Sequence, residues 1–273
     1  WGTITGRLSA RDPALQTIPW APISLNWNLL DDLDISTTGI GMLDGPDEGF
    51  FERGQIFNDD DPDQVSIRHG FIPRLGYKLV SFDFAQMEIR ILLSYLKKSK
   101  FVELMEDPKF DFHAEIAKNI FKVRESSKKF FLYRRMAKDI VFGIIYGIGS
   151  KRLAEILKVS PAEALKYKNL FLKNIEGSRD FIEAVRTKIE RQGFITNRFG
   201  RRYYIPSERN YVGVNYLIQG TSADFLSDKM IEVAKYFEKI GAHMLIQIHD
   251  ELMCEIPDQA VMDTAREVKR ILE

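Results

Sequence analysis

Two stretches place acidic side chains in otherwise apolar, strand-like sequence. Asp83 follows the apolar run GYKLVSF (76–82), and Asp250 and Glu251 stand together within the alternating stretch LIQIHDELMCEIP (245–257). Ions on a strand face cost stability unless they are solvated, paired or bound to a metal. Carboxylates from separate strands can bridge two divalent cations about 4 Å apart, and oxygen ligands favour Mg²⁺. Asp83 and Asp250 are therefore candidate metal ligands; the alternative is that each caps a helix or a turn.

A second group of candidates follows helical spacing within RRMAKDIVFGIIYG (134–147). Steps of four residues predict one stripe that contains Arg134, Lys138, Phe142 and Tyr146. Cations at one end suit a triphosphate, and rings at the other end suit a nucleotide base. The alternative is an ordinary amphipathic helix with basic side chains extended to solvent. Gly143 and Gly147 argue against an ordinary amphipathic helix. A glycine within a helix costs about 1 kcal/mol relative to alanine and usually marks a bend or the close approach of another segment.

Periodicity and turn residues predict a succession of strands and helices that would position these groups. Asp83 lies where a buried strand passes into a helix, and Ser160 followed by Pro161 is typical of a helix start. The predicted elements are a strand over 76–84, a helix over 85–98, mostly helical structure over 101–190, a hairpin over 194–206 around Gly200, and a helix over about 211–239.

Charge is unevenly distributed along the chain. The 273 residues carry 39 basic and 39 acidic side chains, yet residues 22–65 contain eleven acids and one base. The remainder has a formal charge of about +10, which suits a polyanion-binding groove or, as the alternative, an ordinary solvated surface. The acidic segment is rich in Gly, Asp and Pro without a sustained period, and we interpret it as a loop-rich insertion.

Composition favours a globular protein. A hydrophobic content of 45% is ample for one large or two ordinary packed domains. The sequence has no run of 18 or more apolar residues and no signal peptide before the first motif, so we expect neither membrane association nor secretion. Cys254 is the single cysteine, and its strand-like context predicts a buried thiol and a reducing compartment.

Five motifs together resemble DNA polymerase family A, the DNA polymerase I family. SFDFAQMEIR (81–90) resembles the first aspartate motif, RRMAKDIVFGIIYG the nucleotide-binding fingers helix, and IQIHDEL (246–252) the second aspartate motif. TGRLSARDPALQTIP (5–19) resembles the early template-primer motif, and NYLIQGTSAD (215–224) resembles the minor-groove helix. The motifs occur in the family's order over nearly the whole chain, so a chance match is not credible.

The resemblance implies an α+β fold with a palm, which carries the metals on an antiparallel sheet, and helical fingers, which close on the incoming nucleotide. Residues 1–96 would form the N-terminal part of the palm with the acidic insertion at about 22–65, residues 97–205 the fingers, and residues 206–273 a truncated C-terminal part of the palm. The family pattern continues with a thumb on one side and further palm strands on the other. We therefore expect a fragment that extends primers weakly or not at all when expressed alone.

The implied activity is template-directed DNA synthesis, in which dNTPs are added to a primer 3′-hydroxyl and pyrophosphate is released. Two Mg²⁺ ions would support the reaction, and Mn²⁺ can substitute for them. The metal ligands implied by the resemblance are Asp83, the backbone carbonyl of Phe84, and Asp250 at a hairpin turn facing Asp83. Glu251 would act in catalysis by orienting water or the metal ligands.

Further residues are assigned by their positions in the matched motifs. Arg134 and Lys138 would bind the triphosphate, and Lys138 is also counted among the catalytic residues. Phe142 would contact the sugar and base, and Tyr146 would lie near the templating position. His113 would be another phosphate contact.

The resemblance also implies a sugar gate and a DNA path. Glu88, with Gln86 beside it, would close the space that a ribose 2′-hydroxyl needs. Residues implied to follow the primer-template, mainly through the minor groove and phosphates, are Arg7, Gln16, Arg68, Asn215, Gln219 and His249. Acceptors in the minor groove are shared by all Watson–Crick pairs, so such contacts check pair geometry without reading sequence.

The chain departs from the family pattern without losing an implied metal ligand. Phenylalanine at 84 replaces tyrosine, alanine at 85 replaces serine, and valine at 141 replaces asparagine. Ala14 and Thr17 stand where asparagine is usual, which puts some template-primer contacts in doubt.

Expected partners are primer-template DNA and dNTPs, and the protein is expected to be a monomer. The implied location is the cytoplasm of a bacterial or bacteriophage-infected cell, with an organelle as the alternative. Two other functions stay open at this point. A metal-dependent nuclease would also use paired carboxylates but has no use for the stripe on 134–147, and a catalytically silent DNA-binding module would not need Asp83 and Asp250.

Overall fold

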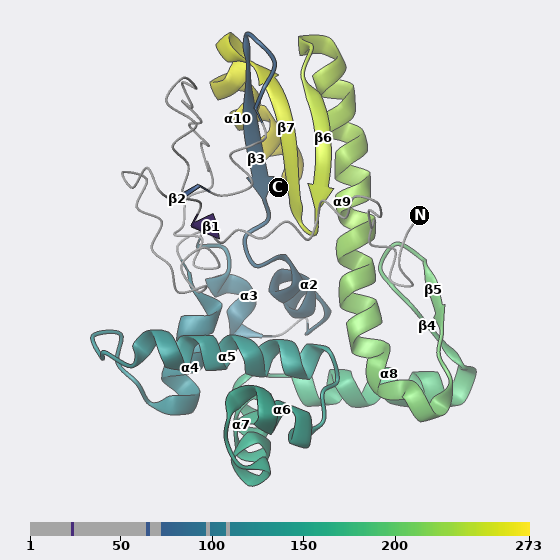
Figure 1. Cartoon of the computed structure of the whole chain (residues 1–273). Coiled ribbons are helices and arrows are strands. Elements are labelled where there is room, and N and C mark those ends of the chain that lie inside the picture. The colour runs from purple at the N-terminus through teal and green to yellow at the C-terminus, as the bar shows by residue number, and fades with distance from the viewer. Residues whose placement is uncertain (1–22, 25–63, 66–71, 97–98, 108–109) are drawn as a thin grey trace. The chain divides into compact units, whose positions relative to one another are not determined.

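The computed structural model describes residues 23–24, 64–65, 72–96, 99–107 and 110–273 (Figure 1). It consists of two compact units. The sheet unit contains the described residues up to Ala85 together with Phe225–Glu273, and the helical unit contains Gln86–Asp224. Most of the acidic segment lies outside the described residues, apart from two short antiparallel strands, β1 (Ile23–Ser24) and β2 (Gln64–Val65).

The sheet unit is built on a three-stranded antiparallel sheet of order β3-β7-β6 (Figure 1). Its elements are β3 (Tyr77–Asp83), β6 (His243–Ile248), β7 (Glu251–Pro257), η4 (Asp258–Ala260), α10 (Val261–Leu272) and the second part of α9 (Gly213–Ile240). Val80 and Phe82 alternate with more exposed residues along β3 and are each 2% exposed. This alternation confirms the predicted strand over 76–84, and α10 packs against β3 and β7.

The alternating stretch 245–257 belongs to two strands and not to one. β6 and β7 are joined at His249 and Asp250, and His249 adopts a left-handed φ of 58°. A hairpin turn of two residues keeps the period-two pattern on both sides, so periodicity alone does not reveal the turn.

Cys254 on β7 is fully buried, which confirms the predicted buried thiol. Burial also raises the pKa of this thiol to about 12.

The helical unit confirms the predicted helices and the predicted hairpin. Its elements are α2 (Met87–Leu96), α3 (Lys100–Leu104), α4 (Phe112–Phe121), α5 (Phe130–Ile145), α6 (Ser150–Leu157), α7 (Pro161–Asn174), α8 (Ser178–Gln192), β4 (Phe194–Thr196), β5 (Arg202–Tyr204), η3 (Ser207–Val212) and the first part of α9. At the start of α7 the Ser160 side chain accepts from the Glu163 amide while the Glu163 carboxylate accepts from Ser160, with Pro161 in the first turn. This capping box satisfies amides that the helix itself leaves unpaired.

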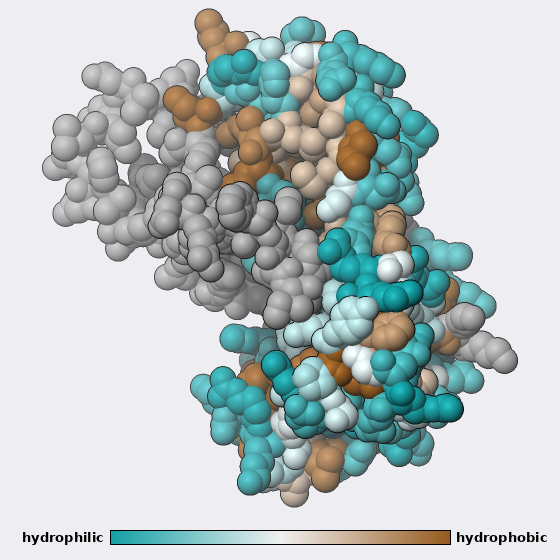
Figure 2. All heavy atoms as spheres, turned by 90° about the vertical axis from the view of Figure 1, so that its right-hand side faces the viewer, coloured by the Kyte–Doolittle hydropathy of each residue, from teal (hydrophilic) through white to brown (hydrophobic). Residues whose placement is uncertain are grey.

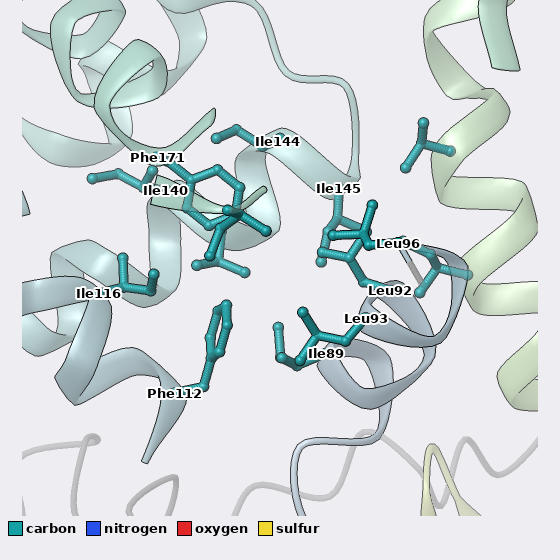
Figure 3. Close-up of a cluster of buried hydrophobic side chains, with 14 of the residues drawn as sticks. Ile89, Leu92, Leu93, Leu96, Phe112, Ile116, Ile140, Ile144, Ile145 and Phe171 are labelled. Atoms are coloured by element: carbon teal, nitrogen blue, oxygen red, sulfur yellow. The ribbon is translucent and has the colours of Figure 1, made fainter. Parts of the chain in front are cut away.

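A hydrophobic core holds the helices of this unit together. Figure 3 shows side chains from α2, α4 and α5, including Leu92, Phe112 and Ile140, that point toward a common interior. Gly143 allows α5 and α6 to approach closely, because a Cβ at this position would lie 3.0 Å from Leu153 Cδ1. Gly147 has a φ of +68°, and a Cβ there would overlap the Tyr211 carbonyl. Both glycines thus confirm the predicted close approach.

The described surface on the face in Figure 2 is mostly hydrophilic, with smaller hydrophobic patches. None of the helices in the described part of the chain combines the length and the apolar character that a membrane crossing requires. The mixture of helices with small antiparallel sheets confirms the α+β class, whereas the boundaries of palm and fingers stay a prediction.

Candidate functional site

Three predicted acidic residues lie at one end of the sheet in the sheet unit. Asp83 is the last residue of β3, Glu251 is the first residue of β7, and the two are Cα partners in the antiparallel register. Asp250 immediately precedes Glu251 in the β6–β7 turn. The structure therefore brings these three residues together at the end of the sheet, with Asp250 in a hairpin turn.

The register also decides which side chains share a face. Asp83 and Glu251 are directly opposite, so their side chains lie on the same face of the sheet, where like charges destabilise each other. Ser81, two residues before Asp83, is on that face as well, and its Oγ donates to Glu251 Oε1 at 2.5 Å. Glu251 is 8% exposed, so this bond holds a buried carboxylate toward the middle of β3.

Two aspartates and the backbone of Phe84 place oxygen atoms near this end of the sheet, and oxygen is the ligand type that a hard divalent cation prefers. Mg²⁺ is such a cation, and it typically keeps waters or substrate phosphates as its other ligands. The Phe84 ring packs edge-on against Phe225, with ring centroids 5.8 Å apart, and this contact restrains the Phe84 side chain. In the described part of the chain, no group of three or more His, Cys, Asp and Glu residues could hold a metal ion.

The helical unit contains the predicted nucleotide stripe on α5 and its C-terminal cap, Tyr146. The rings of Phe142 and Tyr146 are stacked with their centroids 5.9 Å apart. The ring centroid of His113 on α4 also lies 5.9 Å from the ring centroid of Phe142. Lys138 is partly buried one turn before Phe142 and is close enough to His113 to affect its pKa. Cations and rings thus follow one another along the helix in the predicted order.

Arg134, which belongs to this stripe, and the neighbouring His113 are both buried. Arg134 is 8% exposed and donates from Nε to Asp111 Oδ2 at 2.6 Å. Burial, with the nearby charge of Arg134, lowers the pKa of His113 to about 3, so this imidazole is neutral at neutral pH. His113 Nδ1 is buried without a hydrogen-bond partner among the described residues. This part of the helical unit therefore combines a buried positive charge with a neutral imidazole.

The predicted sugar-gate residues occupy the start of α2 and have different partners. Glu88 is 8% exposed, and Tyr146 donates from its hydroxyl to Glu88 Oε2 at 3.4 Å. Gln86 donates from Nε2 to the Phe110 carbonyl at 3.1 Å and accepts at Oε1 from the Phe112 amide at 3.3 Å. Glu88 thus contacts Tyr146 of the stripe, whereas the side-chain amide of Gln86 is hydrogen-bonded to the backbone of Phe110 and Phe112.

The predicted DNA-tracking residues are distributed over several parts of the chain. Asn215 and Gln219 are one turn apart on α9 within the helical unit, and Asn215 Oδ1 is buried without a hydrogen-bond partner among the described residues. His249 is exposed in the β6–β7 turn of the sheet unit. The remaining three, Arg7, Gln16 and Arg68, lie outside the described residues.

Sequence reasoning missed Ser81 and Asp111, which contact predicted site residues. Ser81 lies two positions before Asp83, so the period of a strand could have placed both on one face. Asp111 directly precedes the apolar start of α4, which is the signature of a helix N-cap, and its Oδ1 accepts from the Ala114 amide at 3.0 Å. Its contact with Arg134 has no local signal, because 23 positions separate the two residues.

Comparisons with known proteins place the chain in a family. The family model described as DNA polymerase family A matches residues 1–273. The chain is 30% identical over 282 residues to "DNA polymerase I, thermostable" from Thermus aquaticus, with 99% of this chain and 29% of that protein covered. It is 32% identical over 221 residues to DNA polymerase I from Rhizobium leguminosarum, with 76% and 22% covered. The chain therefore spans less than a third of the length of these relatives.

A solved structure has a similar fold. The Pol domain of Pol1 from M. smegmatis, in complex with DNA primer-template and dNTP, matches with a TM-score of 0.74 and 24% identity, over 99% of this chain and 43% of that chain. This likeness concerns the fold, and the family follows from the sequence match along the whole chain. The chain belongs to DNA polymerase family A.

Proposed function

We propose that this chain carries the nucleotide-adding centre of a template-directed DNA polymerase. The observation that carries the proposal is the arrangement on α5, where Arg134 and Lys138 precede the stacked rings of Phe142 and Tyr146, with His113 beside them. A triphosphate needs fixed positive charge and a base needs an apolar platform, and this helix offers both in sequence. Membership of DNA polymerase family A supports the same function.

The acidic end of the sheet would hold the metal ions. Asp83, Asp250 and the Phe84 carbonyl are the proposed ligands for Mg²⁺, with Mn²⁺ as a substitute. Bound divalent ions would lower the pKa of the primer 3′-hydroxyl and offset negative charge on the triphosphate and the departing pyrophosphate. Glu251, held by Ser81, would orient water or the ligating carboxylates.

The helical unit would bind and select the nucleotide. Arg134 and Lys138 would donate to phosphate oxygens, and neutral His113 would add a hydrogen bond without adding charge. Phe142 would pack against the sugar and base. Glu88, buried beside Tyr146, would exclude a ribose 2′-hydroxyl by occupying its space.

Duplex DNA would be bound without reading its sequence. Asn215 and Gln219 on α9 and His249 in the turn carry groups that can hydrogen-bond to minor-groove acceptors. These acceptors are common to all base pairs, so correct pairs are accepted irrespective of sequence. Such readout suits an enzyme that copies any template.

A primer-extension assay on the full-length protein tests the proposal against the nuclease and the silent module. A 5′-labelled primer on a longer template is incubated with Mg²⁺ and all four dNTPs, with parallel reactions that lack dNTPs or contain EDTA. We expect extension that requires both dNTPs and Mg²⁺. Shortening of the primer without extension would identify a nuclease instead, and binding of the duplex without any change in primer length would identify a silent module.

A further inference from the structure

The side chain of Gln86 clamps a short segment of backbone in the helical unit. Its amide bonds to the carbonyl of Phe110 and the amide of Phe112, the two residues that flank Asp111. Gln86 itself has a left-handed φ of 54°, and its carbonyl accepts from the amides of Ile89 and Arg90 at 3.0 and 3.1 Å. The clamp is therefore anchored to the start of α2 and restricts the backbone on both sides of Asp111.

Asp111 uses its two carboxylate oxygens for two different purposes. Oδ1 caps α4 by accepting from the Ala114 amide, and Oδ2 accepts from Arg134 Nε on α5 at 2.6 Å. Burial raises the pKa of Asp111, but the bonds from Arg134 and Ala114 outweigh burial and lower it, so the carboxylate stays ionised. The Arg134 side chain is only 10% exposed, so this partner restricts where its guanidinium can lie.

We propose that Asp111 and Gln86 are positioning residues that fix the Arg134 guanidinium for the triphosphate of the incoming nucleotide. Gln86 holds the backbone at 110–112, this backbone holds Asp111, and Asp111 holds Arg134. Neither residue needs to touch the nucleotide. The inference rests on the proposed function, because it takes Arg134 as a triphosphate ligand.

Two effects of Asp111 on nucleotide binding oppose each other. Its negative charge repels a triphosphate, so loss of the charge alone would tighten binding. Loss of the contact also releases the Arg134 guanidinium, whose hydrogen bonds to phosphate oxygens depend on its position and orientation. We expect loss of position to dominate, because arginine binds phosphate through directed, often paired, hydrogen bonds.

Asp111→Asn removes the contact with Arg134 while it preserves the N-cap of α4. Asparagine is as good an N-cap as aspartate, so its carbonyl can keep the Ala114 bond, which leaves its NH₂ group facing another donor, Arg134 Nε. In single-turnover incorporation by the full-length protein, we expect the dNTP dissociation constant to rise about tenfold and the maximal rate to change less than about threefold. An unchanged or lower dissociation constant would overturn the inference.

A double-mutant cycle shows whether the effect acts through Arg134. In an Arg134→Ala background, we expect Asp111→Asn to change the dNTP dissociation constant less than about twofold, because the group it positions is gone. Equal effects of Asp111→Asn in both backgrounds would show that Asp111 acts on the nucleotide by another route and would overturn the proposal.

Gln86→Asn tests the contact between Gln86 and the backbone at Phe110 and Phe112. Asparagine tolerates the left-handed backbone conformation, but its side chain is one methylene too short to reach both residues. We expect a smaller rise, about threefold, that also disappears without Arg134.

Ser160→Ala is the matched control, because it removes an N-cap from α7 in the same unit without touching Arg134. We expect Ser160→Ala to lower the thermal unfolding temperature and to leave the dNTP dissociation constant unchanged. If this dissociation constant instead rose as much as in Asp111→Asn, the effect would be due to general destabilisation and the inference would be overturned.

The proposed function and this inference can be told apart by the same measurements. Absence of incorporation by the unsubstituted protein would overturn the proposed function and this inference with it, whereas normal incorporation with no effect of Asp111→Asn would overturn this inference alone.

Discussion

The acidic end of the sheet and the proposed nucleotide-binding stripe of α5 differ in the sign of their charge and in how that charge is paired. At the sheet end, the register places two like charges, Asp83 and Glu251, directly opposite on one face, with Asp250 next in the turn. At the stripe, the buried cation Arg134 has an anionic partner in Asp111, and His113 is kept neutral. The first region concentrates negative charge, which suits a cation, and the second holds positive charge in defined positions, which suits an anion.

The two regions also differ in how the chain assembles them. The acidic end needs only two strand ends and a two-residue turn, so its acidic residues lie within two short motifs. The stripe lies on α5 and its C-terminal cap, but the side chains that contact it come from α2 and α4. Contacting residues are up to 58 positions apart in sequence, as for Glu88 and Tyr146. Removal of charge should therefore abolish activity in the first region, while substitutions in the second should change nucleotide choice and binding.

The largest expected effect is loss of a metal ligand. We expect Asp83→Asn and Asp250→Asn in the full-length protein each to lower nucleotide incorporation at least about a thousandfold, because the charge that holds the ions is lost. Affinity for primer-template, measured by equilibrium binding, should change less than about threefold, since phosphate contacts dominate it. The exposed Asp263→Asn on α10 is the control for loss of a carboxylate in the same unit. Incorporation within about tenfold of the unsubstituted rate would contradict the metal role.

A smaller effect on nucleotide choice is expected for Phe142→Tyr. Phenylalanine has no donor that could substitute for the missing 3′-hydroxyl of a dideoxynucleotide, and tyrosine would supply one. In a competition assay, we expect the preference for normal over chain-terminating nucleotides to fall at least about tenfold, the worth of one hydrogen bond. Phe199→Tyr, in the turn of the β4–β5 hairpin, is a matched control that should leave the preference unchanged. An unchanged preference in Phe142→Tyr would place the sugar elsewhere.

Selection against ribonucleotides should depend on the volume of Glu88. We expect Glu88→Ala to raise the ratio of ribonucleotide to deoxynucleotide efficiency about tenfold, because the excluding side chain is removed. Glu88→Gln keeps the volume and removes the charge, so its ratio should change less than about threefold. A rise in Glu88→Gln equal to that in Glu88→Ala would show that charge and not volume makes the gate. No rise in either variant would place the gate at another residue.

A further expected effect concerns stability and not nucleotide incorporation. His113 has a pKa lowered from 6.5 to about 3 by burial and by Arg134 and Lys138, with Asp111 opposing them. The unfolded chain therefore binds the proton more readily, so stability present above pH 6.5 is lost as the pH falls. Relative to His113→Gln, the unsubstituted protein should lose about 1.6 kcal/mol of unfolding free energy between pH 6.5 and 5. Denaturant titrations at both pH values measure this difference, and parallel pH dependence of the two proteins would contradict a buried neutral His113.

Much of the fold and of the site could be predicted because the necessary signals are local. The period of apolar residues predicts β3 and α5, and Ser160 with Pro161 predicts the start of α7. The hairpin between β6 and β7 is invisible to periodicity, since a two-residue turn preserves alternation. Only the resemblance of the IQIHDEL motif implied that Asp250 occupies a turn.

The sequence by itself determined the class of the fold, the order of its elements, the five motifs and their family, because these depend on neighbours along the chain. The tertiary structure decided which side chains meet: Glu251 opposite Asp83 and bonded to Ser81, and Arg134 bonded to Asp111. It also decided that His113 is neutral, since burial and nearby cations exist only once α4 packs against α5. Strand register and helix packing are set by the whole core, and a contact between residues 23 or 170 positions apart leaves no pattern in either local segment.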